Sequence, residues 1–367
     1  MDLIPQRWEG ETVIGSDALP VDSIELVSLA TNCADRFGLS ELGAGDYLLR
    51  YRRIADWADL AVTGMRQTGT VTFRSSGTTG PAKAVSHRLD DLEQELQVLG
   101  GLIIDARRMV SLVPPHHIYG FLFTILLPMH LGIPVNHKGS ASGMLPADLG
   151  HGDWLVGFPL RWRLMNRMRR SLPPGVAAVT STAPCPAELI RALQGLGLQT
   201  MLAIYGSTET AGVGYRFDPD EPYRLFDYWR WDGQHLCRSR SSGDERTVEP
   251  EDELKFDDPV HFWPQGRKDA VVQVAGRNVH PADVADRLAR HALVAECSVL
   301  LDDSGGEPRL SAAVVPVDGA DAATVEPALR QWAQAQLSSA ERPVQWSVVD
   351  TLPTTSTGKP RGWTASA

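Results

Sequence analysis

Short apolar runs alternate with segments of helical periodicity from Thr70 onward, and this alternation restricts the possible folds more than any other feature of the sequence. It is typical of a mainly parallel sheet covered by helices, because crossover helices lie on the faces of such a sheet. We therefore predict an α/β fold. Its expected strands are Val71–Phe73, Met109–Val113, Trp154–Val156, Val176–Val179 and Met201–Ile204.

The flanking regions have patterns of their own. Residues 1–66 show helical spacing without an assignable motif, and residues 216–264 are polar and rich in turn residues. The tail after Asp269 predicts a small α+β domain. Its expected strands are Ala270–Ala275, Ala295–Leu301, Arg309–Val317 and Val344–Val349, and its expected helices open at Pro281 and span Ala322–Leu337.

Composition and charge exclude several classes of protein. With 35 Lys and Arg against 45 Asp and Glu among 367 residues, the net charge is -10, so nucleic acid is not an expected partner. The four cysteines lie far apart and form no Cys-x-x-Cys pair, which disfavours a zinc site and a disulfide framework. We find no export signal and no membrane span, and predict a cytoplasmic protein.

A loop of small polar residues directly follows the first predicted strand. Its glycines let the backbone approach a polyanion, its hydroxyls can donate to phosphate oxygens, and its lysine adds a positive charge. It lacks the Gly-x-x-x-x-Gly-Lys spacing of a Walker motif, so a P-loop NTPase is disfavoured. An ordinary surface loop would have a similar composition. The loop reads Ser75-Ser76-Gly77-Thr78-Thr79-Gly80-Pro81-Ala82-Lys83.

A second polar segment, Tyr205-Gly206-Ser207-Thr208-Glu209-Thr210, ends the last predicted strand of the sheet. A tyrosine can stack on a purine, a threonine hydroxyl can meet a phosphate, and a glutamate can bind the Mg²⁺ that accompanies ATP. The same residues would also suit a plain exit from a strand.

Two further loops lie toward the end of the chain. In Gly266-Arg267-Lys268-Asp269, the arginine could hold ribose or phosphate oxygens, and Gly276 could line a narrow tunnel. The loop Leu352–Lys359 presents Lys359, and a lysine there can neutralise charge that develops between a carboxylate and a phosphate. A charged turn and a frayed tail are the simpler interpretations.

In this order, the four segments resemble those of the adenylate-forming superfamily, which includes acyl-CoA and aryl-CoA ligases, peptide-synthetase adenylation domains and luciferases. The resemblance covers residues 70–361. It implies that the protein uses ATP and Mg²⁺ to activate a carboxylic acid as an acyl-adenylate. It further implies transfer of the acyl group to the thiol of CoA or of a holo-acyl carrier protein, with release of AMP and pyrophosphate.

The resemblance also implies roles for single residues. In the loop Ser75–Lys83, Thr78, Thr79 and Lys83 would contact the β- and γ-phosphates. His117, within Pro115-His116-His117-Ile118-Tyr119-Gly120, would gate the carboxylate of the acid. Ala183 and Pro184, within Ser181-Thr182-Ala183-Pro184, would frame adenine. Tyr205 would stack on adenine, Thr208 would meet the phosphate, and Glu209 would bind Mg²⁺.

The resemblance extends to the domain organisation. Residues 1–268 would form an N-terminal domain that binds ATP and the acid, and residues 269–367 a mobile C-terminal domain with its hinge at Asp269. One pose would deliver Lys359 for adenylation, and the other would bring the Gly276 loop to form the thiol tunnel. Arg267 would contact the ribose.

The sequence departs from the family pattern in two places. Only 74 residues precede Ser75, so the N-terminal part of the family is shortened. The ribose-binding aspartate has no Thr-Gly-Asp context here; its place reads Pro250-Glu251-Asp252-Glu253-Leu254, and we assign Asp252 by its spacing to Arg267, with Glu253 next to it.

The acid and the acceptor remain open at this point. The segment Gly276–Pro281 looks most like the aryl-acid branch of the family. The arginine-rich stretch Arg161–Arg170 would suit a carrier protein or the phosphates of CoA, or would simply be a solvated helix face. Two alternatives are a nucleotide-binding regulator without turnover and a ligase that uses a non-thiol acceptor.

Overall fold

The structure is a computed structural model of the chain. It describes residues 9–74, 83–137, 145–240, 242–268, 272–274, 277–302 and 309–352. The chain forms two compact units, residues 1–248 and 249–367, which are described separately below. This division falls earlier than the predicted domain boundary after residue 268. Asp269 lies outside the described residues, so the hinge stays a prediction.

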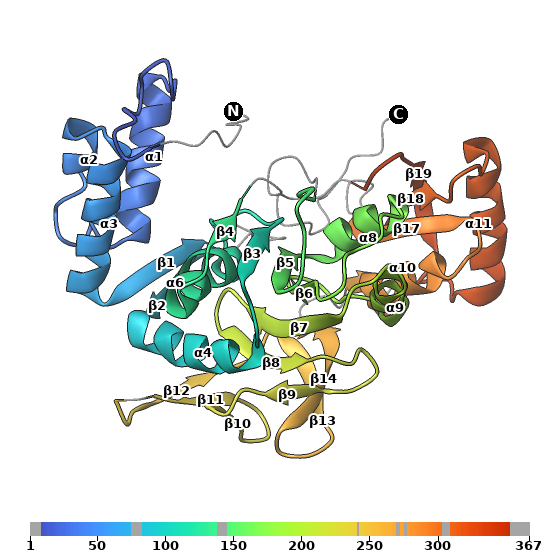
Figure 1. Cartoon of the computed structure of the whole chain (residues 1–367). Helices are drawn as coiled ribbons and strands as arrows, with labels where there is room; N and C mark the ends of the chain where they lie inside the picture. Colours follow the sequence, from blue (N-terminus) through green and yellow to red (C-terminus); the bar gives the residue numbers. More distant parts are fainter. Residues whose placement is uncertain are drawn as a thin grey trace. The chain divides into compact units, whose positions relative to one another are not determined.

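Unit 1 begins with helices, as predicted for residues 1–66. The first helix starts with a reciprocal cap: Asp22 accepts from the backbone N–H of Glu25 at 2.8 Å, and Glu25 accepts from the backbone N–H of Asp22 at 3.0 Å. Gly69, at φ 67°, ends the last helix in the left-handed conformation. The helices are α1 (Ser23–Arg36), α2 (Tyr47–Arg50) and α3 (Ile54–Thr68) (Figure 1).

The central sheet of unit 1 confirms the predicted mainly parallel fold. Its strand order is β9-β8-β7-β6-β5-β3-β4. From β4 to β7 the neighbours are parallel, whereas β7, β8 and β9 are antiparallel. The strands are β3 (Arg108–Ser111), β4 (Val135–Asn136), β5 (Asp153–Gly157), β6 (Ala177–Thr180), β7 (Thr200–Ser207), β8 (Ala211–Arg216) and β9 (Tyr223–Leu225).

Helices connect these strands and bury their apolar residues against the sheet. In the arginine-rich stretch, Trp162 and Met165 lie three residues apart on one helix face and pack into the core with Leu155 and Ile190. The connecting helices are α4 (Leu89–Leu102), α5 (Ile118–Phe121), the π-helical η1 (Leu122–Leu126), α6 (Leu127–Leu131), α8 (Pro159–Arg167) and α9 (Ala187–Gly195).

The first predicted strand does not join the parallel sheet. It forms β1 (Thr70–Arg74), which pairs antiparallel with β2 (Ala84–Arg88) in a separate two-stranded sheet. The prediction was wrong here because the connection from β1 to β2 is too short for the crossover that parallel strands require. The predicted phosphate loop is therefore the connection of a hairpin.

A small antiparallel sheet follows in the polar region, where sequence patterns are weak. Its strands are β10 (Trp229–Trp231), β11 (Leu236–Ser239) and β12 (Glu245–Val248). Arg238 on β11 is fully buried, with its guanidinium carbon 4.2 Å from the ring centre of Tyr228. Stacking on an aromatic ring suits a guanidinium that has lost its water.

Unit 2 confirms the predicted α+β tail. Strands β17 and β18 are antiparallel, β18 and β19 are parallel, and their core includes Leu288, Val299 and Leu310. The elements are β13 (Asp252–Phe256), β14 (His261–Arg267), β15 (Val272–Val274), β16 (Arg277–Val279), α10 (Pro281–Ala289), β17 (Val294–Asp302), β18 (Arg309–Pro316), α11 (Ala322–Gln336) and β19 (Pro343–Val348). Across both units, no helix within the described ranges is long and apolar enough to cross a membrane.

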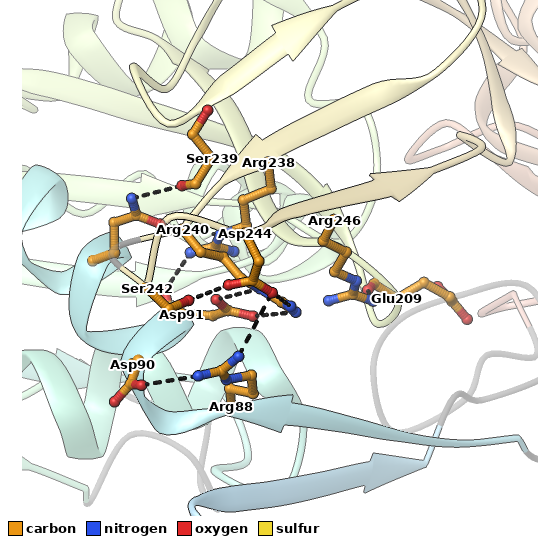
Figure 2. Close-up of polar contacts among 11 residues, drawn as sticks. Arg88, Asp90, Asp91, Glu209, Arg238, Ser239, Arg240, Ser242, Asp244 and Arg246 are labelled. Atoms are coloured by element: carbon orange, nitrogen blue, oxygen red, sulfur yellow. Dashed lines mark hydrogen bonds and ion pairs between the residues drawn. The ribbon is translucent and has the colours of Figure 1, made fainter.

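Helix α4 buries a polar face against the small sheet of unit 1. Asp91 is 2% exposed and binds Arg240 through both carboxylate oxygens, at 3.0 and 3.1 Å (Figure 2). The backbone oxygen of Asp91 accepts from Arg238, and Gln94 donates to the carbonyl of Ser239 at 2.9 Å. These bonds replace the water that the buried groups have lost, and they fix α4 to β11.

Replacing Asp91 by alanine should therefore destabilise the protein. Arg240 is only 16% exposed and would lose both oxygens of its buried partner. We expect the free energy of unfolding in urea to fall by about 3 kcal/mol. The control is Asp90→Ala, since Asp90 is 73% exposed and should cost no more than about 0.5 kcal/mol. Equal losses in the two variants would contradict an anchoring role for Asp91.

Candidate active site

The parallel strands of unit 1 bring three of the predicted site segments to one edge of the sheet. The carboxyl ends of parallel strands meet at one edge, which is where ligands bind in open α/β sheets. His117 follows β3, residues 181–184 follow β6, and Tyr205 to Glu209 end β7 and enter the turn after it. Because β6 and β7 are neighbours, the last two segments lie beside each other.

The turn after β6 is strained. Thr182 has φ 77°, which is rare for a β-branched residue, and its buried hydroxyl has no hydrogen-bond partner within the described residues. Ala183 and Pro184 follow it and are exposed. Strain of this kind collects at ligand sites, where the fold holds a backbone in one conformation. The predicted role of this segment in framing adenine thus has a backbone feature to support it.

The turn between β7 and β8 is held by its own side chains. The hydroxyl of Ser207 accepts from the backbone N–H of Glu209 at 3.1 Å, and the hydroxyl of Thr210 accepts from the N–H of Ser207 at 3.0 Å. A Cβ on Gly206 would lie 2.1 Å from the carbonyl oxygen of Ala211, so only glycine fits there. Gly206 and Ser207, predicted to bind the nucleotide, therefore have structural roles in the turn.

The side chains at the tip of this turn are available to a ligand. Thr208 and Glu209 are half-buried, and neither side chain makes a hydrogen bond or ion pair with another described residue. The ring of Tyr205 lies 5.8 Å from that of Tyr223, centre to centre. No group of three or more His, Cys, Asp or Glu side chains in the described ranges could hold a metal ion. One free carboxylate suits Mg²⁺ that arrives bound to nucleotide phosphates.

A buried histidine connects the hairpin that carries the predicted phosphate loop to this turn. His87 lies on β2, and its Nε2 lies 2.7 Å from the carbonyl oxygen of Thr208. Burial lowers the pKa of His87 to about 4, so the ring is neutral near pH 7. A carbonyl only accepts, so Nε2 carries the proton and donates it. The hairpin that carries the predicted phosphate loop is thereby joined to the turn after β7 by one hydrogen bond.

A buried glutamate contacts β8, the strand that follows the same turn. Glu95 on α4 is fully buried and accepts from the backbone N–H of Gly212 at 3.0 Å. A Cβ on Gly212 would lie 2.4 Å from the Glu95 carboxylate, so the close approach requires glycine. Burial raises the pKa of Glu95 to about 7, despite the nearby charge of Arg238.

The N-terminal helices also contact the candidate site. Arg36, at the end of α1, donates to the carbonyl oxygen of His116 at 2.8 Å, and its guanidinium lies 5.1 Å from the ring centre of Phe73. Asp35 pairs with Arg74, the residue before the predicted phosphate loop, at 3.0 Å. His117 itself is the N-cap residue of α5 and is half-buried. The helices before β1 thus support two of the predicted site loops.

The remaining predicted site residues are described only in part. Lys83 is exposed and directly precedes β2. In unit 2, Asp252 and Arg267 are partners across the β13–β14 pair, which agrees with the spacing argument for Asp252. The predictions for Ser75, Ser76, Gly77, Thr78, Thr79, Gly80, Asp269, Gly276 and Lys359 lie outside the described residues.

Comparisons with known proteins identify the class. Residues 71–227 match the AMP-binding enzyme family, and residues 283–359 match the AMP-binding enzyme C-terminal domain. The chain is 37% identical to a 4-coumarate–CoA ligase of Cereibacter sphaeroides over 362 residues, which cover 96% of this chain and 86% of that protein. It is 35% identical to a 4-coumarate–CoA ligase of Halorhodospira halophila, with 94% and 88% covered. The chain therefore belongs to the AMP-binding enzymes, the adenylate-forming superfamily.

Solved structures agree on the fold. ATP-bound MatB from Rhodopseudomonas palustris has a TM-score of 0.63 and 17% identity, with 94% of this chain and 81% of that chain covered. The anthranilate CoA ligase AuaEII with anthranoyl-AMP has a TM-score of 0.60 and 17% identity; the likeness covers 79% of this chain and 64% of the AuaEII chain. The predictions of the superfamily, of its fold and of an AMP-forming ligase are confirmed.

Sequence reasoning missed His87, Glu95 and Arg36. Each is a single polar residue within a strand or helix and belongs to no motif with fixed spacing. A polar residue at an inward-facing position of a helix is a weak signal of a buried polar contact. Glu95 gives this signal, because it lies four residues after Asp91 on α4 and both side chains are buried. His87 and Arg36 gave no signal that we can identify.

The shifted pKa values of Glu95 and His87 predict opposite effects of pH on the free energy of unfolding. Between pH 4.5 and 7, folded Glu95 keeps a proton that the unfolded chain releases, so its contribution to stability is lost as pH rises. Between pH 4 and 6.5, the unfolded chain binds a proton that folded His87 lacks, so its contribution is lost as pH falls. In the wild type the two contributions oppose each other.

Glu95→Gln should remove only the first contribution. The variant's free energy of unfolding should then rise more steeply with pH than that of the wild type between pH 4.5 and 7, and the difference should level off above pH 7. Urea unfolding at several pH values measures this. Parallel pH profiles for the two proteins would show that Glu95 does not titrate in this range.

Proposed function

We propose that the protein activates an aryl carboxylic acid with ATP and transfers the acyl group to CoA. The observation that carries the proposal is the turn at Thr208 and Glu209, whose backbone is fixed while both side chains remain available. Its relatives named 4-coumarate–CoA ligase, at 37% and 35% identity, support an aryl acid and CoA. A 4-coumarate-like acid is therefore the first substrate to test.

The proposed reaction has two steps. A carboxylate oxygen of the acid attacks the α-phosphorus of ATP, the bond to the β-phosphate oxygen breaks, and pyrophosphate leaves. The thiolate of CoA then attacks the acyl carbon of the adenylate, and AMP leaves as the thioester forms. When bound, Mg²⁺ would neutralise phosphate charge near Glu209.

The chain's residues have separate tasks in this proposal. Lys83 and the loop before it bind the outer phosphates, and Tyr205 and Ala183 hold adenine. His117 orients the acid, with its loop held by the bond from Arg36 to His116. Asp252 and Arg267 hold the ribose. Lys359 stabilises the charge that develops during adenylation. Rotation of the C-terminal domain about Asp269 then replaces Lys359 by the Gly276 loop for the second step.

The choice of CoA over a carrier protein rests on the relatives and on α8. The helix directs Trp162 and Met165 into the core, and the guanidinium of Arg161 lies 5.9 Å from the ring centre of Phe158. Arg170, just after the helix, donates to the carbonyls of Leu145 and Pro146 at 3.1 Å. Part of the arginine-rich stretch thus serves the fold, which weakens the case for a carrier-protein surface.

The central prediction concerns Lys359. Lys359→Ala should lower the rate of acid-dependent pyrophosphate release from Mg·ATP by at least ~100-fold, because it removes a cation that stabilises the first transition state. The same variant should still convert a synthetic acyl-adenylate and CoA to acyl-CoA, since that step uses the other pose. Lys255→Ala is the control, because Lys255 is exposed on β13 and has no predicted role.

The acid panel should include 4-coumarate, other cinnamates, benzoates and fatty acids, each with CoA, with a holo carrier protein and without a thiol. Pyrophosphate release that needs an aryl acid, with AMP release that needs CoA, would establish the proposal. ATP binding without pyrophosphate release from any acid would favour the regulator instead. AMP release that no thiol accelerates would favour a non-thiol acceptor.

A further inference from the structure

We infer that His87 and Arg246 are positioning residues that hold the Thr208–Glu209 turn for Mg·ATP, and that Arg246 does so from the small sheet β10–β12. The inference rests on the proposed function for the identity of the ligand. Neither residue belongs to a motif that predicted the site, and they reach the turn from two different sheets. Figure 2 shows Arg246 beside Glu209.

The turn needs external support because its own side chains serve its N–H groups. Ser207 and Thr210 accept from the N–H groups of Glu209 and Ser207, but they do not occupy the carbonyls of Thr208 and Glu209. A free backbone carbonyl in a partly buried turn would have to be satisfied by water. Here each of the two carbonyls accepts from a side chain that is distant in the sequence.

The first donor is His87. Its Nε2 lies 2.7 Å from the Thr208 oxygen, and the ring is fully buried next to Phe73, with ring centres 6.0 Å apart. Because the ring is fully buried, bulk water does not compete for this hydrogen bond. The carbonyl of Thr208 is thereby held at a fixed distance from β2, the strand that directly follows Lys83.

The second donor is Arg246, on β12. Its Nη2 donates to the carbonyl oxygen of Glu209 at 2.9 Å. The buried carboxylate of Asp91, whose charge acts on Arg246, uses both of its oxygens for Arg240. Arg246 is half-buried, and no carboxylate of the described residues lies within ion-pair distance of it. Its charge thus remains available to favour an anion beside Glu209.

The consequence is a turn whose backbone is fixed before the ligand binds. The Thr208 hydroxyl and the Glu209 carboxylate, which have no partner within the described residues, are then presented in one arrangement. A pre-organised site loses less conformational entropy on binding. Loss of either donor should therefore weaken Mg·ATP binding, whereas binding of the acid should change little.

Arg246→Met tests the inference, because methionine keeps most of the length and removes the donor. We expect the KM for Mg·ATP to rise about tenfold, the effect of losing one charge-assisted hydrogen bond, while the KM for the acid stays within about twofold. Arg246→Lys retains a charged donor and should restore the KM to within about threefold of wild type. The matched control is Arg230→Met, since Arg230 is an exposed arginine of the same sheet, paired with Glu245.

A second readout does not depend on turnover. Hydrogen exchange of the peptide covering residues 205–212 should accelerate by on the order of tenfold in Arg246→Met and stay unchanged in Arg230→Met. His87→Leu should act in the same direction, and His87→Gln, which keeps a donor, should act less. If His87→Leu does not fold, the three arginine variants still decide the question.

The outcomes separate this inference from the proposed function. If the wild type releases no pyrophosphate with any acid, the proposed function fails. The inference is then tested by Mg·ATP binding measured by calorimetry and by hydrogen exchange of residues 205–212. Unchanged exchange in Arg246→Met, with Mg·ATP affinity within twofold of wild type, would overturn the inference. An equal rise in the KM values for Mg·ATP and for the acid would also overturn it, because that pattern indicates general damage.

Discussion

The arrangement of the candidate site depends on the hydrogen bond from His87 to the carbonyl of Thr208, which joins residues 121 positions apart. His87 belongs to the β1–β2 hairpin, which is separate from the parallel sheet, whereas Thr208 follows the carboxyl end of β7. Because the imidazole is buried and neutral, the bond forms where water does not compete. Without it, the hairpin with its predicted phosphate loop would lose a direct contact with the turn that is proposed to bind Mg·ATP.

The polar face of α4 gives this arrangement a rigid base. Asp91 and Glu95 lie one helical turn apart, and they hold two different parts of unit 1: Asp91 binds Arg240 beside β11, and Glu95 binds the backbone of Gly212 on β8. Buried polar groups of this kind are costly unless they are satisfied, so they specify one way of packing the helix. The helix therefore sets where the small sheet lies, and the small sheet in turn presents Arg246 to the turn at Glu209.

The N-terminal helices support the candidate site through their contacts with two loops. The end of α1 contacts both the strand before the phosphate loop, through Asp35 and Arg74, and the histidine loop, through Arg36. These contacts are few, and Asp35 and Arg74 remain partly exposed. The support is therefore local: the helices fix the bases of two loops.

The sequence by itself determined the elements whose signals are local. Apolar runs and helical periodicity predicted the parallel strands, the N-terminal helices and the order of the C-terminal unit, and the motifs at Ser75, Tyr205 and Lys359 predicted the superfamily. Only the tertiary structure decided that Val71–Phe73 belongs to a hairpin, that Glu95 is buried under Gly212, and that Arg246 reaches Glu209. The physical reason is that such contacts join residues far apart in the chain, so they leave no periodic pattern in the sequence. In addition, the sequence around a single histidine or arginine looks the same whether the side chain is buried or solvated.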